Sequence, residues 1–275
     1  MNAWILAARP KTLSAAVVPV MVGASLVRGP LDWWLLTYTL LGSILIQIAT
    51  NFINDALDFK KGTDTSERLG PMRVTSAGLL SADAVMRGAY LCLAGAALCG
   101  VPLIMHAGWQ LLAIGVASIL MAYAYTGGPY PLAYHGLGEI FVISFFGVIA
   151  VGGTYLVQTL RWTRDVTIAG VGVGCLATVL LVINNLRDVT GDRVSNKKTT
   201  VVRFGETFAR MEITLLALAP FAVAVFLKRF ATLIALPFAV VVIVKSWRGS
   251  GRALNKSLAL AGLLQWAYGL LFLAV

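Results

Sequence analysis

The sequence has 275 residues and a formal net charge of +10, and 59% of its residues are hydrophobic while only 12% are charged. Because soluble domains carry about 25% charged residues, this composition excludes an ordinary soluble domain and indicates a polytopic membrane protein. In such a protein, excess positive charge marks the loops, so we expect no nucleic-acid partner. The three cysteines lie in apolar stretches without metal-ligand spacing, as is typical of buried small side chains.

Apolar stretches of transmembrane length, about 20 residues each, recur along the chain. They predict an all-α membrane bundle of about nine transmembrane helices. We expect residues 1–275 to form a single domain, with spans one to four and five to eight as two four-helix units and one further helix. The predicted spans are residues 12–28, 33–54, 84–104, 109–126, 137–158, 166–186, 208–227, 230–247 and 254–273.

Charged residues divide unequally between the two ends of the predicted bundle. Nearly all of the 22 lysines and arginines fall at the N-terminus or in and beside the loops after the even-numbered spans. The exceptions are Arg28, Arg161, Arg164, Lys228 and Arg229. The positive-inside rule therefore places the N-terminus and these loops in the cytoplasm and the C-terminus outside. The acids follow the same division except for Asp32 and Asp165, so we expect any chemistry at the cytoplasmic face.

The second span ends in a polar stripe, which is unusual for so apolar a segment. The stripe consists of Gln47, Asn51, Asn54, Asp55 and Asp58, which share one face of a helix. Carboxylates on a membrane helix are costly, so they mark a functional site by default. We expect Asn54 and the two acids to carry the chemistry, and the two deeper amides either to line a cavity or to support the site residues from behind.

A matching cluster closes the sixth span. Asp188 and Asp192 are spaced i, i+4, and Asn184 and Asn185 lie one turn earlier on nearly the same face. In both clusters, amides and paired carboxylates at the end of an apolar helix precede a basic loop. The basic residues that follow the acids are Lys60, Arg73, Lys197 and Lys198.

Paired carboxylates at these spacings suit a hard divalent cation. Mg²⁺ binds through one or two carboxylates together with substrate phosphates, and Lys and Arg bind phosphate oxygens. Two acid pairs facing one cavity, with basic loops above, therefore predict a Mg²⁺–diphosphate site in which diphosphate is a leaving group. Isolated acids at helix ends are often only interfacial caps, but two matched clusters favour the functional interpretation.

The motifs resemble those of the UbiA superfamily of intramembrane aromatic prenyltransferases, over residues 8 to about 210. Beyond Asn54-Asp55-x-x-Asp58 and Asp188-x-x-x-Asp192, several segments are similar to its menaquinone branch. These segments are Ala8–Leu13, Phe59–Asp64, Arg68–Arg73, Tyr125–Leu132 and Gly136–Glu139. The resemblance implies transfer of a polyprenyl group from an allylic diphosphate to 1,4-dihydroxy-2-naphthoate. Diphosphate and CO₂ would be lost and demethylmenaquinone formed.

The resemblance also implies roles for single residues. Asp58, Asp188 and Asp192 would be the catalytic acids. Two Mg²⁺ ions bridging to diphosphate would be held by Asn54, Asp55, Asp58, Asp188 and Asp192. The superfamily's third acid falls at Gly62, for which Asp64 is the nearest substitute. Diphosphate would contact Lys60, Arg73, Lys197 and Lys198, and the aromatic acceptor or cavity would involve Lys11, Asn51, Tyr125, Tyr130, Glu139, Asn184 and Asn185.

Two alternatives to this function remain at the level of sequence. The acceptor of a UbiA-type enzyme could be another aromatic, such as homogentisate or 4-hydroxybenzoate. A cation-coupled transporter would also carry intramembrane carboxylates, but its acids lie at the membrane midplane and not beside basic loops at helix ends.

Overall fold

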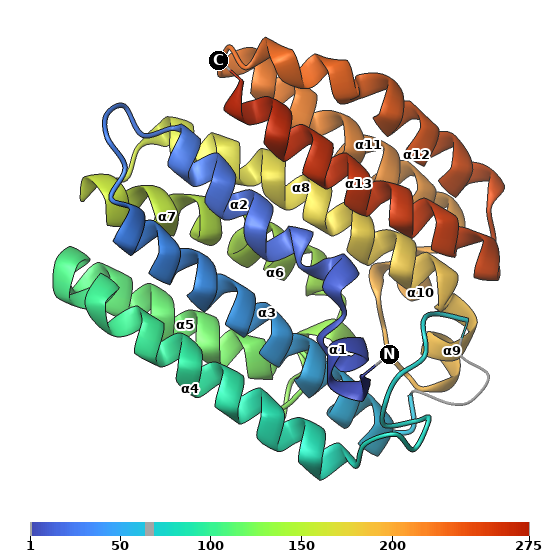
Figure 1. Cartoon of the computed structure of the whole chain (residues 1–275). Coiled ribbons are helices and arrows are strands. Elements are labelled where there is room, and N and C mark those ends of the chain that lie inside the picture. The colour runs from blue at the N-terminus through green and yellow to red at the C-terminus, as the bar shows by residue number, and fades with distance from the viewer. Residues whose placement is uncertain (1, 64–68, 275) are drawn as a thin grey trace.

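The computed structural model describes residues 2–63 and 69–274, and within them every long element is a helix. Figure 1 shows the long helices running side by side, with the N-terminus, α9 (Val189–Val194) and α10 (Thr200–Phe204) at one end of the bundle. The C-terminus lies at the other end. The prediction of an all-α membrane bundle is confirmed.

The first half of the chain begins with a short helix and a 3-10 turn, which meet α2 at a bend of 46°. Asp32 caps the next helix by accepting a hydrogen bond from the backbone of Leu35, and Ser81 caps the following one through Ala84. The elements are α1 (Ala3–Ala8), η1 (Pro10–Thr12), α2 (Ser14–Ser25), α3 (Trp33–Lys60), α4 (Ala82–Ala107), α5 (Trp109–Ala124) and η2 (Leu132–Tyr134).

The second half contains one continuous span that includes a π-helical turn. This span runs from α6 (Gly138–Ile143) through the π-helix η3 (Ser144–Ile149) into α7 (Ala150–Thr159). Such turns are rare and often lie at functional sites. The remaining elements are the long helices α8 (Arg164–Arg187), α11 (Glu206–Phe226), α12 (Leu236–Arg248) and α13 (Leu254–Leu273) and the short 3-10 helices η4 (Phe230–Ala235) and η5 (Gly251–Ala253).

The predicted count of nine spans is not confirmed. Among the described residues, seven helices are long and apolar enough to cross a membrane, or eight if the bent pair formed by residues 3–12 and 14–25 is one span. The predicted span 109–126 corresponds to α5, which has only 16 residues. The second span is longer than predicted because α3 continues through the polar stripe to Lys60. The stripe is therefore held at fixed helical spacing.

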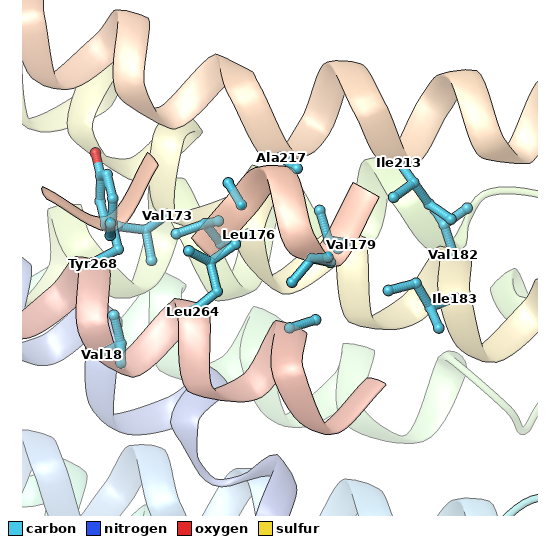
Figure 2. Packing of buried hydrophobic residues seen from close by; sticks show 14 of the residues in the cluster. Val18, Val173, Leu176, Val179, Val182, Ile183, Ile213, Ala217, Leu264 and Tyr268 are labelled. Carbon is cyan, nitrogen blue, oxygen red and sulfur yellow. The ribbon is translucent and has the colours of Figure 1, made fainter. Parts of the chain in front are cut away.

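The main core surrounds α8. Of the apolar stretch of this helix that could cross the membrane, 72% is buried inside the protein, the largest share of any described span. Figure 2 shows Val173, Leu176 and Val179 of this helix packed among side chains of α2, α11 and α13. Because α8 is apolar on every side, it can be covered by neighbours all round. Between lipid-embedded helices, close van der Waals packing supplies much of the stability.

Glycines allow η3 to approach α8 closely. A methyl group built on Gly147 would lie 2.3 Å from the carbonyl oxygen of Gly170 and 2.7 Å from the Cα of Gly174. Both of these neighbours are backbone atoms, so they could yield only if the two helices moved apart. This contact positions the π-helical turn and the aromatic residues beside it.

We expect Gly147→Ala to lower the thermal unfolding temperature in detergent by about 2–12 °C, because overpacking costs about 1–3 kcal/mol. Gly115→Ala is the matched control, since a methyl group at Gly115 would meet no atom within 4 Å. Thermal denaturation of the purified variants gives the comparison. Equal unfolding temperatures for the two would contradict the role assigned to Gly147.

Candidate active site

The cytoplasmic end of α3 presents two polar side chains to the loop after α5. Asn54 accepts a hydrogen bond from the Thr126 hydroxyl. Asp58 is 5% exposed and accepts a 2.9 Å hydrogen bond from the Tyr134 hydroxyl, while its second oxygen lies 3.4 Å from Nη2 of Arg73. Spacing of i, i+4 places these two α3 side chains on one helix face, as predicted.

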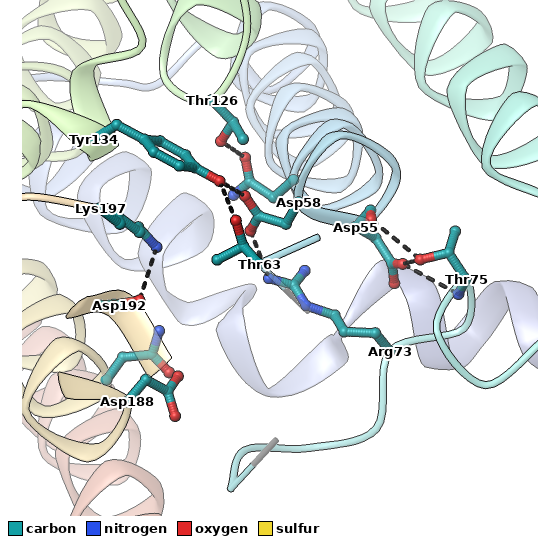
Figure 3. A network of polar contacts seen from close by, with 12 residues as sticks. Asp55, Asp58, Thr63, Arg73, Thr75, Thr126, Tyr134, Asp188, Asp192 and Lys197 are labelled. Carbon is teal, nitrogen blue, oxygen red and sulfur yellow. Dashed lines mark hydrogen bonds and ion pairs between the residues drawn. The ribbon is translucent and has the colours of Figure 1, made fainter. Parts of the chain in front are cut away.

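Asp55 faces a different segment from the one that Asp58 faces. It accepts 3.2 Å hydrogen bonds from the backbone nitrogens of Val74 and Thr75 and a further one from the Thr75 hydroxyl (Figure 3). Asp55 therefore anchors the loop that carries Arg73. Its predicted role as a metal ligand does not fit this geometry, because both carboxylate oxygens already hold that loop.

The second acid cluster lies where α8 ends and α9 begins. Buried Arg187 donates to both oxygens of Asp188, at 2.8 and 2.6 Å, and to Asn184 at 2.5 Å. The same guanidinium donates to Asn255 of α13 at 2.9 Å. This planar, fully charged group orients Asp188 and ties the cluster to a helix far away in the sequence. The sequence reasoning did not single out Arg187.

Tyr134 joins the two acid clusters. Its hydroxyl binds Asp58, and its ring centroid lies 5.6 Å from Nζ of Lys197, which in turn is 3.8 Å from Asp192. Figure 3 shows Tyr134 joined to Asp58, with the pair formed by Lys197 and Asp192 lying beside the tyrosine ring. The loops also bond directly, since the backbone nitrogen of Lys198 donates to the Tyr134 carbonyl at 3.1 Å. Two regions about 130 residues apart in the sequence thus lie together, while their shared role as one site stays a prediction.

Lys61, which was not among the predicted site residues, also reaches this network. Its ammonium donates to the Thr126 carbonyl at 2.5 Å and lies 4.3 Å from the Tyr134 ring centroid. Burial lowers the pKa of Lys61 below its ordinary value, with Asp58 opposing this effect and Lys197 adding to it. A cation held over an aromatic face is favourably placed and partly desolvated.

The other predicted phosphate contacts differ in position. Arg73 and Lys197 lie in the network, while Lys198 lines a neighbouring open pocket together with Lys61 and His135. Lys60 instead points to the surface, where it pairs with Asp83 at 2.7 Å. Lys60 therefore does not point toward the place predicted for diphosphate. Lys60 and its neighbour Lys61, which does reach the network, point about 100° apart because they are adjacent in a helical turn. The predicted Asp64 lies outside the described residues.

The deeper amides of α3 hold the N-terminal segment. Asn51 donates to the Ala8 carbonyl at 2.9 Å and to the Thr12 hydroxyl at 3.0 Å, and Gln47 donates to the same hydroxyl at 3.2 Å. Of the two roles expected for these amides, the contacts agree with support from behind the site and not with lining the cavity. Lys11, within the anchored segment, is exposed.

The remaining predicted acceptor residues separate into two groups. Tyr125 packs on Phe141 with ring centroids 5.0 Å apart, whereas Tyr130 is exposed and stacks on His135 at 3.7 Å. Buried Glu139 accepts hydrogen bonds from Thr200 at 2.8 Å and from Asn185 at 3.5 Å. Tyr125 is thus near the apolar interior and Tyr130 is at the surface.

An open apolar cavity extends between α3, α4, α5 and the span α6–α7, and its lining reaches Thr50 and Ala122, each one helical turn from the hydrogen-bonded pair Asn54 and Thr126. Thr50, one helical turn from Asn54, lines it, as do Phe141, Phe145 and Phe146. The last two of these aromatics belong to the π-helical turn. In the sequence, the spacing Phe-x-x-x-Phe-Phe could have indicated that these three aromatic side chains line one cavity.

The donor chemistry fits a hard divalent cation that is completed by substrate. Among the described residues, no group of three or more His, Cys, Asp or Glu side chains is close enough to hold an ion. Carboxylates, an amide and basic groups do meet around Asp58 and Asp192. This set suits Mg²⁺, which binds through few carboxylates and keeps waters and phosphate oxygens as its other ligands.

A network of charged groups and an apolar cavity within one membrane bundle are the arrangement expected of an intramembrane enzyme. A model described as the UbiA prenyltransferase family matches residues 16–272. The chain belongs to this family, which favours the enzyme over the transporter alternative and confirms the resemblance seen in the sequence.

Relatives of known description agree with this family. The chain is 37% identical over 220 residues to a 1,4-dihydroxy-2-naphthoate octaprenyltransferase of Haemophilus influenzae, covering 74% of this chain and 70% of that one. A protein of the same description from Mycobacterium tuberculosis is 37% identical over 210 residues, covering 76% and 72%. The fold is similar to that of a UbiA homolog from Archaeoglobus fulgidus bound to DMAPP and Mg²⁺, with a TM-score of 0.68, 15% identity and full coverage of both chains.

Proposed function

We propose that this protein transfers a polyprenyl group from an allylic diphosphate to 1,4-dihydroxy-2-naphthoate. Diphosphate and CO₂ leave, and the product is demethylmenaquinone, an intermediate of menaquinone biosynthesis. The observation that carries the proposal is the network joining Asp58, Tyr134, Lys197 and Asp192, together with the apolar cavity whose lining reaches Thr50, one helical turn from Asn54. The naphthoate acceptor is supported by relatives at 37% identity over about three quarters of the chain.

The two acid clusters would hold the metal on either side of the diphosphate. Asn54 and Asp58 would supply ligands for one Mg²⁺, and Asp188 and Asp192 for a second. When bound, the metal would neutralise charge on the departing diphosphate. Residues 1–275 would then act as one prenyltransferase domain, since both halves contribute to a single site.

The basic side chains would receive the leaving group. Arg73, Lys61 and Lys197 are held in place by Asp58, Tyr134 and Asp192, so they need little reorganisation when the allylic carbon–oxygen bond breaks. The bonding electrons leave with the diphosphate, and the allylic cation lies beside the aromatic cluster.

The aromatic rings at the cavity mouth would stabilise the allylic cation. Tyr125 and Phe141 lie there with neighbouring Phe145, whose ring centroid is 4.9 Å from that of Phe141. The apolar walls exclude water, which would otherwise capture the cation. The acceptor ring attacks the cation through the carbon that bears the carboxylate, and that carboxylate leaves as CO₂.

This chemistry would take place at the cytoplasmic face of a bacterial cell membrane. The network, the N-terminal segment and the loop segments rich in Lys and Arg lie at the same end of the bundle (Figure 1). The positive-inside rule assigns that end to the cytoplasm and the C-terminus to the outside.

The acceptor is tested by assaying the protein in membranes with Mg²⁺, one labelled allylic diphosphate and each candidate acceptor in turn. We expect prenylation of 1,4-dihydroxy-2-naphthoate, with a product mass that shows loss of CO₂. Prenylation of homogentisate or 4-hydroxybenzoate instead would retain the enzyme class and overturn the proposed acceptor.

The neighbouring residues Lys61 and Lys60 allow the proposed diphosphate contact to be tested, with Lys60 as the control. We expect Lys61→Met to lower kcat/KM for the allylic diphosphate by about 10- to 100-fold, because it removes one positive charge aimed at the leaving group. Lys60→Met should remain within about two-fold, since that side chain pairs with Asp83 at the surface. Steady-state kinetics in detergent distinguishes the two, and an equal loss in both variants would contradict the assignment.

A further inference from the structure

The apolar cavity extends away from the acids toward a floor of packed apolar side chains. It is lined by Thr50 and Ala122 near the site and by Tyr38 and Leu111 at the far end. At this far end, buried Leu103, Leu111 and Val157 pack together with Tyr38 and form the floor. A hydrocarbon tail whose diphosphate lies at the acids would therefore run along the cavity toward this floor.

The length of the cavity can be measured along its wall helices. From Tyr38 to Thr50 on α3, and from Leu111 to Ala122 on α5, a rise of 1.5 Å per residue gives about 16–18 Å. An isoprene unit adds four backbone bonds, one more than an amino-acid residue, and so extends about 4.5 Å. The cavity is thus long enough for about four isoprene units.

Gly115 of α5 lines this cavity and lacks the usual reasons for a glycine in a helix. A Cβ added there would meet no atom within 4 Å, unlike one at Gly147 or Gly23, which would meet backbone at 2.3 and 2.5 Å. Its backbone φ is not in the left-handed region either. Glycine within a helix costs about 1 kcal/mol relative to alanine. Neither close packing nor backbone geometry compensates for this cost.

We infer that Gly115 keeps the inner part of the cavity open, so that the enzyme accepts the first four or so isoprene units of its donor inside the protein. Any further units would lie outside this cavity. Gly115 is four residues from Leu111 and seven from Ala122, which places it about 6 Å from the floor and about 10 Å from the mouth. A large side chain at this position would leave room for about two units. This inference rests on the proposed prenyl transfer.

The test compares donors of two and four isoprene units in wild-type protein, Gly115→Leu and Gly115→Val, with Mg²⁺ and 1,4-dihydroxy-2-naphthoate. Ala113→Leu is the matched control, because it adds the same bulk to an exposed position on the same helix. We expect Gly115→Leu to lower kcat/KM for the four-unit donor at least ten-fold relative to the two-unit donor, and Gly115→Val to have a smaller effect in the same direction. The ratio should be unchanged in Ala113→Leu.

The two-unit donor reports whether each variant is folded and active. An unchanged ratio in Gly115→Leu, equal losses with both donors in both Gly115 variants, or the same change in Ala113→Leu would overturn the inference while leaving the proposed function intact. Absence of transfer from any donor by the wild-type protein would overturn both.

Discussion

Asp58→Asn should abolish prenyl transfer, with kcat reduced by at least about 100- to 1,000-fold, while the protein stays folded in the membrane. Asparagine keeps the shape of the side chain and can still accept the Tyr134 hydrogen bond, so the local structure should persist. It removes the negative charge that holds Arg73 in place and that a divalent cation needs as a ligand. Product formation in membranes, measured with saturating Mg²⁺ and both substrates, gives the result.

Asp83→Asn is the control for this substitution. Asp83 is an exposed acid near the same end of the bundle, paired only at the surface with Lys60. Its loss should leave kcat within about two-fold, because exposed ion pairs contribute little. Activity of Asp58→Asn comparable to that of Asp83→Asn would refute the metal assignment for the first cluster.

A comparable loss of turnover is expected for Asp188→Asn. Asp188 receives two hydrogen bonds from Arg187, whose side chain is only 1% exposed. Asparagine would keep one of the two acceptor oxygens but remove the charge, leaving a buried guanidinium without its carboxylate. We expect activity to fall by about 100-fold or more. The unfolding temperature should fall as well.

The loss of turnover and the loss of stability in Asp188→Asn can be separated, because diphosphate binding can be measured without turnover. Binding of Mg²⁺ with inorganic diphosphate, measured by calorimetry at a temperature well below unfolding, should weaken at least ten-fold in Asp188→Asn. Asp165→Asn changes the same residue type at the opposite, exposed end of α8 and should bind as the wild type does. Undiminished diphosphate binding by Asp188→Asn would mean that this acid has only a structural role.

The same acids that would hold metal are paired with basic side chains from distant segments. Arg73 pairs with Asp58, Lys197 with Asp192 and Arg187 with Asp188. The basic groups are thereby oriented toward the place where diphosphate would lie. Such preorganisation is a main source of catalytic power, because the charges do not have to be rearranged as the bond breaks.

The sequence alone determined the membrane bundle, the family and the two acid clusters. Hydropathy is a property of each segment by itself, so α3, α8 and most other spans could be located without tertiary information. Helical spacing likewise placed Asn54 on the same face as Asp58, because the rotation per residue of a helix is constant.

Only the tertiary structure decided which of several neighbouring side chains lie in the network and which point elsewhere. Asp55 and Lys60 were predicted to act at the site, yet they face the Thr75 loop and the surface, whereas Lys61, Tyr134 and Arg187 complete the network. The partners of these residues lie on other helices and loops, far away in the sequence. The cavity beside Gly115 likewise exists only between packed helices, so spacing along one helix cannot reveal it. Local periodicity says which face a residue occupies, but the contacts of that face depend on how the helices assemble.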